Sequence, residues 1–356
     1  MIQPVKIHGR AIGPGYPCFI IAEAASNHDR DLGKAKALID AAVEAHADAV
    51  KFQVFSAETI AANTRHPIAI LNDQFKAHGR TLQELYKNAE LPREWTAILA
   101  AYARERQITF LSTPFDHPAV DELVALKVPA LKIASFEIVD FPLLRKCART
   151  GLPIIMSTGM ANMGEVEEAV EVVKAEGSRE IALLHCNINY PPPYEEINLR
   201  AIDAMREALQ LPVGYSDHTT GDHIPIAAVA RGACIIEKHF TLSRKKGSGP
   251  DHSFSMEPDE LARMISRIRE VEIALGDGRK RCPPSEEKHR LRGRRSLFYT
   301  RNIAAGEVVR EPDLIALRPG VGLHTRFMPE IIGRKLARDV RAHDPISWDD
   351  FMGERA

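Results

Sequence analysis

Short apolar runs alternate with longer amphipathic stretches along most of the chain. The run at residues 18–22 reads CFIIA, an amphipathic stretch at 31–45 follows it, and the next run, at 48–55, reads DAVKFQVF. Apolar positions at helical spacing predict a helix over 31–45, whereas compact apolar runs of this length are typical of buried strands. A strand, a helix and another strand in succession predict a parallel pair, because the helix returns the chain to the edge where the first strand began.

This alternation recurs up to Gly276. We expect strands at residues 18–22, 48–55, 108–113, 130–135, 153–158, 180–186, 212–215 and 233–237, each followed by a helix or a helical connection. Eight such units predict an α/β fold of the (β/α)8 TIM barrel type. Residues 1–17 are punctuated by Gly and Pro, which predicts a short hairpin or lid under the barrel. Residues 56–91 break the rhythm, and we expect an insertion there, over the active-site face.

The composition changes after Gly276. The next residues, 277–293, are charged and contain prolines, which predicts a linker. From residue 294 onward, short apolar pieces alternate with glycine turns, and this pattern favours a small β-clip-like domain. We therefore expect a barrel domain at 1–276, a linker at 277–293 and a C-terminal domain at 294–356.

Overall composition adds mainly exclusions. The formal net charge is −1, so no global charge favours binding to nucleic acid. No apolar run reaches the length of a membrane span, and the first residues lack the apolar centre of a secretory signal. The five cysteines are scattered, which argues against a disulfide framework or a zinc knuckle and favours a reducing compartment. We expect a cytoplasmic protein with no membrane or nucleic-acid partner.

Polar side chains follow the apolar runs at the point where each strand is expected to end. In a barrel these carboxyl ends meet on one face, where the chemistry of the fold is placed. Two lysines among several hydroxyls and amides predict an oxyanion pocket for a phosphate and a carboxylate. The candidates are Glu23, Lys51, Gln53, Thr113, Lys132, Ser135, Glu137, Ser157, Asn187, Tyr190, Ser216, His218, His239 and Asp251.

Two histidines stand out in this set. His218 and His239 follow neighbouring strands, and neutral imidazole is a common ligand of divalent metal ions. The plain alternative is that one histidine packs inside the barrel and the other is solvated. The glycine-rich segment 247–252 places a further carboxylate, Asp251, just after the last strand, which favours a metal site.

The motifs GYSDHT, EKHFTL and GPDHSFSMEPDEL resemble those of the nonulosonic acid synthases, the family of sialic, legionaminic and pseudaminic acid synthases. The resemblance spans nearly the whole chain. It implies that phosphoenolpyruvate condenses with an open-chain N-acetylated amino sugar and water, giving a nine-carbon 2-keto-3-deoxy acid and phosphate. The C-terminal module resembles the antifreeze-like SAF fold. The motifs SFEIVDFPL, STPFD and FSMEPDEL favour a pseudaminic acid synthase, with N-acetylneuraminate and legionaminic acid synthases as alternatives.

The resemblance also implies roles for single residues. Lys51, Thr113, Lys132, Ser135, Ser157 and Ser216 match positions that hold phosphoenolpyruvate, and Glu23, Gln53, Tyr190 and Asp251 match positions that face the sugar. His218 and His239 match ligands of a divalent metal, Mn²⁺ or Mg²⁺, with Co²⁺ also open. Arg318 matches an arginine given to the neighbouring subunit, and Phe298 lies near another such contact, which implies a domain-swapped homodimer. We expect Glu23, Glu137 and Lys51 to act in catalysis.

One departure from the family pattern affects the asparagines. Some members read TNIYP after the cysteine, whereas this chain reads NINYP, so Ile188 stands where an asparagine would bind. Either Asn187 or Asn189 takes over that contact, or the contact is absent.

Three other functions remain open at this point. A desolvated lysine such as Lys51 can act as the nucleophile of a Schiff-base aldolase. Another phosphoenolpyruvate-dependent synthase would make an eight- or seven-carbon sugar acid, although the C-terminal module argues against it. A non-catalytic carbohydrate-binding or ice-binding protein could carry the same small domain, but it would not need the strand-end set.

Overall fold

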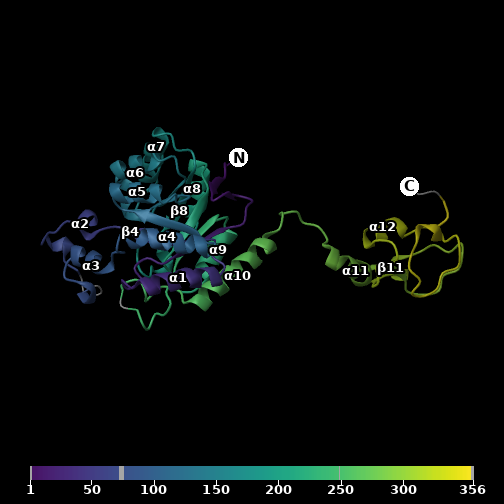
Figure 1. The fold of residues 1–356 in the computed structure, drawn as a ribbon. Coiled ribbons are helices and arrows are strands. Elements are labelled where there is room, and N and C mark those ends of the chain that lie inside the picture. The colour runs from purple at the N-terminus through teal and green to yellow at the C-terminus, as the bar shows by residue number, and fades with distance from the viewer. Residues whose placement is uncertain (1, 72–75, 248, 354–356) are drawn as a thin grey trace. The chain divides into compact units, whose positions relative to one another are not determined.

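The chain divides into two compact units, Met1–Gly276 and Asp277–Ala356, in the computed structural model (Figure 1). The structure describes residues 2–71, 76–247 and 249–353. None of the helices in these ranges has the length and apolar character that a membrane crossing requires. Each unit has its own apolar core, and the two are described separately below.

The first unit is a closed barrel of eight parallel strands. The order around the barrel is β10-β3-β4-β5-β6-β7-β8-β9, so β10 closes the ring against β3. This confirms the predicted (β/α)8 fold. The strands are β3 (Phe19–Glu23), β4 (Ala49–Val54), β5 (Thr109–Pro114), β6 (Leu131–Ile133), β7 (Ile154–Ser157), β8 (Ile181–Cys186), β9 (Val213–Asp217) and β10 (Ile235–His239).

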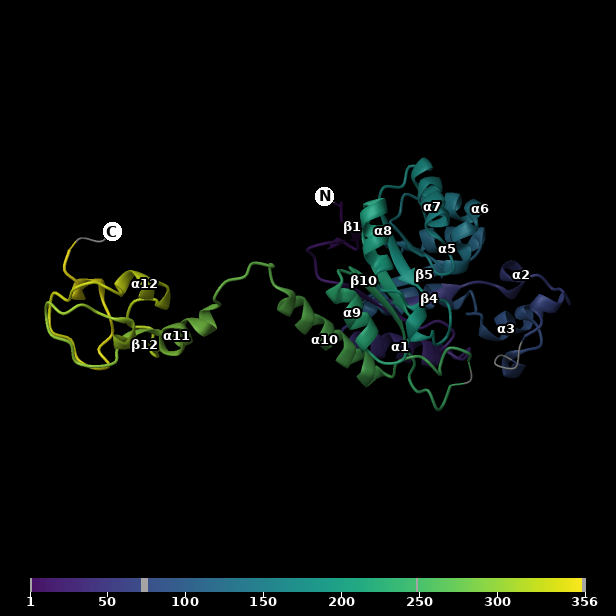
Figure 2. The ribbon, with the colours of Figure 1, turned by 180° about the vertical axis from the view of Figure 1, so that it is seen from behind.

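Helices between the strands surround the barrel (Figures 1 and 2). Several begin where the sequence supplies a capping side chain, because a carboxylate or amide oxygen accepts a backbone N–H that the helix leaves free. Asp31 and Asp116 cap in this way, and Asn162 forms a full capping box with Glu165. The helices are α1 (Leu32–Glu44), α4 (Trp95–Glu105), α5 (His117–Ala125), α6 (Phe141–Ala148), α7 (Met163–Ala175), α8 (Ala201–Leu209), α9 (His223–Ala230) and α10 (Pro258–Leu275).

An N-terminal hairpin closes one end of the barrel, as predicted. Strands β1 (Val5–Ile7) and β2 (Arg10–Ile12) pair antiparallel. The side chains of Val5, Ile7 and Ile12 are buried and belong to the same apolar cluster as the inward-facing residues of the barrel strands. The hairpin therefore fills the amino-terminal end of the barrel, and the opposite end is left for chemistry.

An insertion separates β4 from α4, as the broken rhythm of residues 56–91 predicted. It contains α2 (Ala57–Ile60) and α3 (Leu82–Ala89), which lie together outside the ring of barrel helices in both views (Figures 1 and 2). Tyr86 of α3 packs edge-on against Phe55, which follows β4 directly, with ring centroids 5.6 Å apart. The insertion is thus anchored at the carboxyl end of a barrel strand.

The second unit combines short strands with turns. It holds α11 (Pro284–Gly293), β11 (Ser296–Tyr299), β12 (Leu314–Leu317) and α12 (Met328–Ile331), and β11 pairs antiparallel with β12. Its core includes Leu297, Tyr299 and Leu336. The segment predicted as a linker therefore contains a helix, which Pro284 begins, and which has acidic residues in its first turn and basic residues in its last.

Candidate active site

The inward face of the barrel changes from apolar to polar along every strand. Side chains on one face of a strand recur every second residue. The buried cluster inside the barrel includes Ile21, Ala49, Leu111, Ala130, Ile155, Leu184 and Ile235. Two residues further along each strand stand Glu23, Lys51, Thr113, Lys132, Ser157, Cys186 and Glu237. On β9 the same step leads from Gly214 to Ser216, so all eight strands carry a polar group at the same level.

Glu237 lies between the two lysines of this layer. Its Oε1 atom is 3.7 Å from Lys51 Nζ and 3.6 Å from Lys132 Nζ, and all three side chains are at most 5% exposed. Burial opposes ionisation of Glu237, but Lys132 and Lys51 outweigh burial and hold its pKa below the ordinary value. The arrangement places two ammonium groups around one carboxylate in a site shielded from water.

Each lysine also donates to a hydroxyl on a neighbouring strand. Lys51 Nζ is 3.0 Å from Thr113 Oγ1, and Lys132 Nζ is 2.6 Å from Ser157 Oγ. Ser216 Oγ donates to Glu237 over 3.3 Å. Burial lowers the pKa of Lys132, because its charge is costly in a dry site. The predicted phosphate-holding residues on β4, β5, β6, β7 and β9 are therefore brought together.

Glu23 joins this cluster from β3. Its Oε2 atom is 2.6 Å from Lys51 Nζ, and its Oε1 atom accepts from Gln53 Nε2 at 2.9 Å. Burial raises the pKa of Glu23, although Lys51 opposes the rise. Burial likewise opposes the charge of Lys51, but Glu23 and Glu237 outweigh it and raise the pKa of the ammonium group. Lys51 is thus held as a cation, which does not suit a Schiff-base nucleophile.

Ser135 and Glu137 lie in the 3-10 turn Ser135–Val139 after β6. The Ser135 hydroxyl accepts the backbone N–H of Gly159 at 3.1 Å, which ties this turn to the end of β7. Burial raises the pKa of Glu137 to about 7. A carboxyl group that titrates near neutral pH can give or take a proton at the pH of the cell.

His218 and His239 stand side by side, as the sequence predicted for neighbouring strands. Their ring centroids are 5.0 Å apart, and both side chains are buried. His218 Nδ1 is 2.6 Å from the carbonyl oxygen of Asn187, which orients the ring and leaves Nε2 for a ligand. The rings of Tyr190 and Phe254 pack against both histidines, so the pair has an apolar surround.

The donor set near these histidines fits a loosely held divalent ion. His239 Nδ1 and Glu237 Oε2 are buried and make no hydrogen bond within the described part of the chain. Burial and the neighbouring His218 lower the pKa of His239, which keeps this imidazole neutral as a metal ligand requires. Among residues 2–71, 76–247 and 249–353, no cluster of three or more His, Cys, Asp or Glu side chains is gathered for one metal ion. Water would supply the remaining ligands of an ion held by two histidines.

The two asparagines differ in where they lie. The Asn187 carbonyl contacts His218, and its side-chain oxygen accepts the backbone N–H of Asn189 at 2.9 Å. Asn189 is exposed, and its side chain donates to Glu196 at 3.4 Å. Of the two residues left open by the sequence, Asn187 is the one that contacts the two-histidine site.

Asp251 lies on the segment after β10, and its Oδ2 atom accepts from Ser26 Oγ at 2.7 Å. Burial raises the pKa of Tyr190, and the nearby Cys186 and Asp251 add to this rise. Asp251 therefore lies near Tyr190, whose ring packs against both histidines. Its predicted contact with the sugar stays a prediction.

Phe298 and Arg318 belong to the second unit. Phe298 is buried in β11, and Arg318 is exposed directly after β12. Their predicted contribution to a neighbouring subunit stays a prediction.

Glu237 and Cys186 also belong to this polar layer, although neither was among the residues predicted from the sequence. Both lie on the inward face, two residues after an apolar inward residue. The spacing Ile235, Glu237, His239 was a sufficient signal, because a strand that turns His239 inward turns Glu237 inward as well.

A closed parallel barrel with buried lysines, carboxylates and histidines at its strand ends defines a barrel enzyme. The chain belongs to the NeuB family, whose model matches residues 38–280, and residues 294–352 match the SAF domain. This confirms the predicted family, the nonulosonic acid synthases, and the predicted class of enzyme.

Named relatives span nearly the whole chain. The chain is 41% identical to an N,N'-diacetyllegionaminic acid synthase of Legionella pneumophila, covering 97% of this chain and 98% of that one. It is 37% identical to a pseudaminic acid synthase of Helicobacter pylori, covering 94% and 98%. The solved structure of an N-acetylneuraminic acid synthetase from Leptospira borgpetersenii, in complex with citrate, is 36% identical with a TM-score of 0.72, covering 81% and 95%.

Proposed function

We propose that this chain condenses phosphoenolpyruvate with an open-chain N-acylated amino sugar and water, and releases a nine-carbon 2-keto-3-deoxy sugar acid and phosphate. The observation that carries the proposal is the pair of buried lysines, Lys51 and Lys132, set among hydroxyls on neighbouring strands. Two fixed cations with hydroxyl donors suit a small ligand that bears both a phosphate and a carboxylate.

Residues of the polar layer would hold this ligand. Lys51, Thr113, Lys132, Ser135, Ser157 and Ser216 are the proposed ligand-holding set. When the anion binds, the lysines would exchange part of their interaction with Glu237 for the ligand, so the ligand and Glu237 would compete for the same two cations. The low exposure of these groups keeps water away from the phosphate, which strengthens each electrostatic contact.

The sugar would lie beside the histidines. Tyr190, Gln53 and Asp251 are proposed to face it, and Glu23, which accepts a hydrogen bond from Gln53, is proposed to position or protonate it. His218 and His239 would hold Mn²⁺ or Mg²⁺, with Co²⁺ also compatible, and the bound ion would supply Lewis acidity at the aldehyde oxygen. The fit rests on two buried atoms without a hydrogen-bond partner in the described part of the chain, His239 Nδ1 and Glu237 Oε2.

The chemistry then follows a balanced course. C3 of phosphoenolpyruvate forms a bond to the aldehyde carbon, and the aldehyde oxygen becomes a hydroxyl by taking a proton. Water adds to C2, where positive charge has developed, and loses its proton to a carboxylate. The C–O bond to phosphate then breaks, and the C2 hydroxyl passes its proton to the leaving phosphate, which leaves a ketone at C2. Glu137, with a pKa of about 7, and Glu237, which faces both lysines, are the carboxylates proposed to steady the cation or accept the proton.

The sequence motifs and the overall identity to known relatives favour different sugar substrates. The motifs SFEIVDFPL, STPFD and FSMEPDEL favour a pseudaminic acid synthase. Identity over the whole chain is higher to two legionaminic acid synthases, at 41% and 42%, than to three pseudaminic acid synthases, at 35–37%. Both sugars are diacetamido 6-deoxy hexoses that differ in stereochemistry, so the proposed mechanism is the same for each.

Phosphate release from phosphoenolpyruvate with Mn²⁺ tests the proposal. Three sugars are tested: N-acetylmannosamine, the 6-deoxy diacetamido relative of this mannose sugar (the diacetamido mannose relative), and the diacetamido altrose. Release with the altrose alone identifies a pseudaminic acid synthase, and release with the diacetamido mannose relative alone identifies a legionaminic acid synthase. Lys132→Met is the matched inactive control. Silence across the panel, with folded and metal-loaded protein, would contradict the proposal and favour a non-catalytic protein.

Two further features belong to the proposal. We propose a domain-swapped homodimer in which the C-terminal unit of one copy contacts the barrel of the second copy. Arg318 and residues near Phe298 would make this contact. The exposed position of Arg318 is compatible with such a role. We also propose a cytoplasmic enzyme, because its five cysteines are all free thiols, as a reducing compartment requires.

A further inference from the structure

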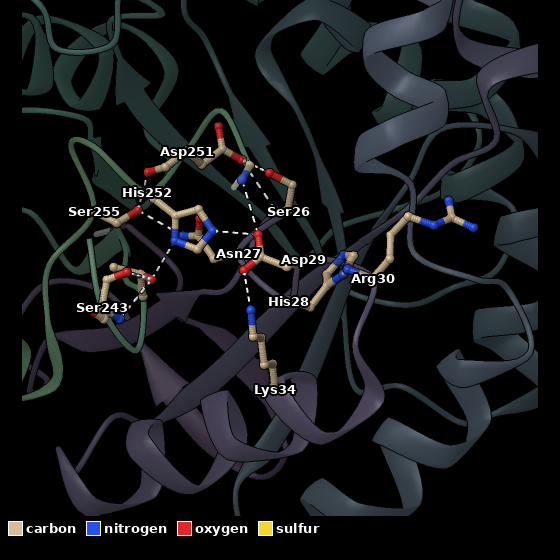
Figure 3. A network of polar contacts seen from close by, with 12 residues as sticks. Ser26, Asn27, His28, Asp29, Arg30, Lys34, Ser243, Asp251, His252 and Ser255 are labelled. Carbon is tan, nitrogen blue, oxygen red and sulfur yellow. Dashed lines mark hydrogen bonds and ion pairs between the residues drawn. The ribbon is translucent and has the colours of Figure 1, made fainter. Parts of the chain in front are cut away.

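A buried network of hydrogen bonds joins the segment after β10 to the loop after β3 (Figure 3). His252 is at its centre, with Nε2 2.9 Å from Asp29 Oδ1 and Nδ1 2.7 Å from Thr241 Oγ1. The side chains of His252 and Asp29 are 5% and 6% exposed. A carboxylate accepts hydrogen bonds, so His252 Nε2–H donates to Asp29, and Nδ1 accepts from the hydroxyl of Thr241.

Asp29 links three parts of the barrel unit at once. Beside His252, it accepts from Lys34 Nζ of α1 at 2.7 Å and from the backbone N–H of Gly249 at 3.1 Å. Its own backbone is left-handed, with φ of 49°, and so is that of Arg30, with φ of 53°. Aspartate tolerates this conformation better than most residues, so the turn can present the Asp29 side chain to all three partners.

The segment that this network fixes carries two groups of the active site, one on each side of His252. Asp251 Oδ2 is held by Ser26, and the other carboxylate oxygen points away from the network (Figure 3). The ring of Phe254 is 5.1 Å from that of His239 and 5.0 Å from that of Tyr190. A shift of His252 would therefore displace a carboxylate and an aromatic ring together.

A glycine gives independent support. A Cβ atom at Gly247 would lie 2.1 Å from the ring of His252, closer than any real contact. A side chain at position 247 would displace the ring of His252, so glycine lets the ring stand where it reaches Asp29.

We infer that Asp29 and His252 form a positioning pair, which holds residues 249–256 so that Asp251 and Phe254 face the two-histidine site. The pair itself does not touch the reacting atoms. The part of the inference that concerns catalysis rests on the proposed function, whereas the part that concerns the order of the segment does not. The expected signature is a defect in the use of the sugar with normal binding of phosphoenolpyruvate.

Two conservative substitutions divide the network. Gln at 252 places its amide near Nε2 of the histidine, so His252→Gln retains the bond to Asp29 and loses the one to Thr241. Asn places its amide near Nδ1, so His252→Asn retains Thr241 and loses Asp29. His252→Ala removes both, and His289→Ala, at an exposed position of α11, is the control. Circular dichroism and thermal unfolding establish that each variant is folded.

The first measurement is hydrogen exchange of residues 249–256 in ligand-free full-length protein. We expect His252→Ala and His252→Asn to speed exchange in this segment by about tenfold or more, and His252→Gln to stay near wild type. This result does not depend on the enzyme's reaction. Unchanged exchange in His252→Ala, or equal exchange in the Gln and Asn variants, would overturn the inference.

The second measurement distinguishes an effect on the use of the sugar from an effect on the binding of phosphoenolpyruvate. We expect kcat/KM for the active sugar to fall by about 10- to 100-fold in His252→Asn, with the Kd for phosphoenolpyruvate, measured calorimetrically with Mn²⁺, within about twofold of wild type. Loss of phosphoenolpyruvate binding to the same degree would overturn the positioning role. If wild-type protein uses no sugar while the exchange pattern appears, the proposed function fails and the positioning pair stands.

Discussion

Glu237 lies between two ammonium groups, those of Lys51 and Lys132. In the ligand-free protein its negative charge therefore stabilises the fold by balancing the two buried lysines. We expect Glu237→Gln to lower the free energy of unfolding by about 3 kcal/mol, because it leaves two buried lysines without their shared partner. Urea unfolding measures the change, with exposed Glu168→Gln on α7 as the control. Phosphoenolpyruvate should restore more stability to Glu237→Gln than to wild type, since its anionic groups replace the lost charge. A variant as stable as wild type would show that Glu237 does not balance the lysines.

Glu137 predicts a dependence of stability on pH. Its pKa rises from 4.5 in the unfolded chain to about 7 in the folded protein, so the folded state binds more protons between these values. The contribution of Glu137 to the free energy of unfolding is fully present below pH 4.5. It is lost as the pH rises through 7, which lowers the free energy of unfolding by about 3 kcal/mol.

The test compares wild type with Glu137→Gln at pH 5 and pH 8. The free energy of unfolding of wild type should fall relative to that of the variant between the two pH values. Glu168→Gln, on the exposed face of α7, should follow wild type throughout. Parallel profiles for wild type and Glu137→Gln would contradict the raised pKa.

At the residue scale, the sequence predicted which side chains gather at the strand ends. It did not predict that Glu237 balances the charge of the two lysines. Lys51, Lys132 and His218 could be placed together because strand ends of a barrel share one face. Glu237 ends the expected strand at 233–237, but its contact with both lysines depends on how β4, β6 and β10 meet, which spacing does not determine. The choice between Asn187 and Asn189 depended on how the chain turns after β8, which spacing does not determine.

At the scale of the element, Gly214 leaves no room for a side chain between β9 and its neighbouring strands. A Cβ atom there would lie 2.4 Å from the carbonyl oxygen of Ile235 and 2.7 Å from the side chain of Leu184. We expect Gly214→Ala to destabilise the barrel by about 2 kcal/mol or more, because the strand would have to move away from β8 and β10. Gly164→Ala on α7, where only a capping oxygen lies within 4 Å, should change stability by less than about 1 kcal/mol. Similar values for the two variants would contradict this account of β9.

Strands and helices of the barrel could be predicted because each has a clear period of apolar residues. The position of the insertion could be predicted, but its structure could not. Helices α2 and α3 bury few residues, and the contact of Tyr86 with Phe55 that anchors them joins residues far apart in the sequence. Helix α11 was taken for a linker because it lacks an apolar face, and no residue of it is buried. Its cue was local, in Pro284 and the charges at its ends.

At the scale of the whole molecule, the proposed exchange of Arg318 between subunits can be tested by mixing two inactive chains. Arg318→Ala keeps a complete barrel, and Lys132→Met keeps the arginine. If the arginine acts on a second copy, coexpression restores about a quarter of wild-type activity through mixed dimers. If it acts within its own chain, the mixture stays inactive, and the domain-swapped arrangement is wrong. Light scattering on wild type gives the number of subunits independently.

The division of labour within the barrel unit has a practical consequence. Most groups proposed for phosphoenolpyruvate stand on the strands, with Ser135 in the turn after β6. Asp251, which is proposed to face the sugar, lies on the segment after β10, and the insertion follows β4. Grafting those two segments from a relative with another sugar would retain the whole strand layer. Asp29 lies in the loop after β3, outside both segments, so a graft of the segment after β10 should bring the relative's residue at position 29 with it and keep the pair matched.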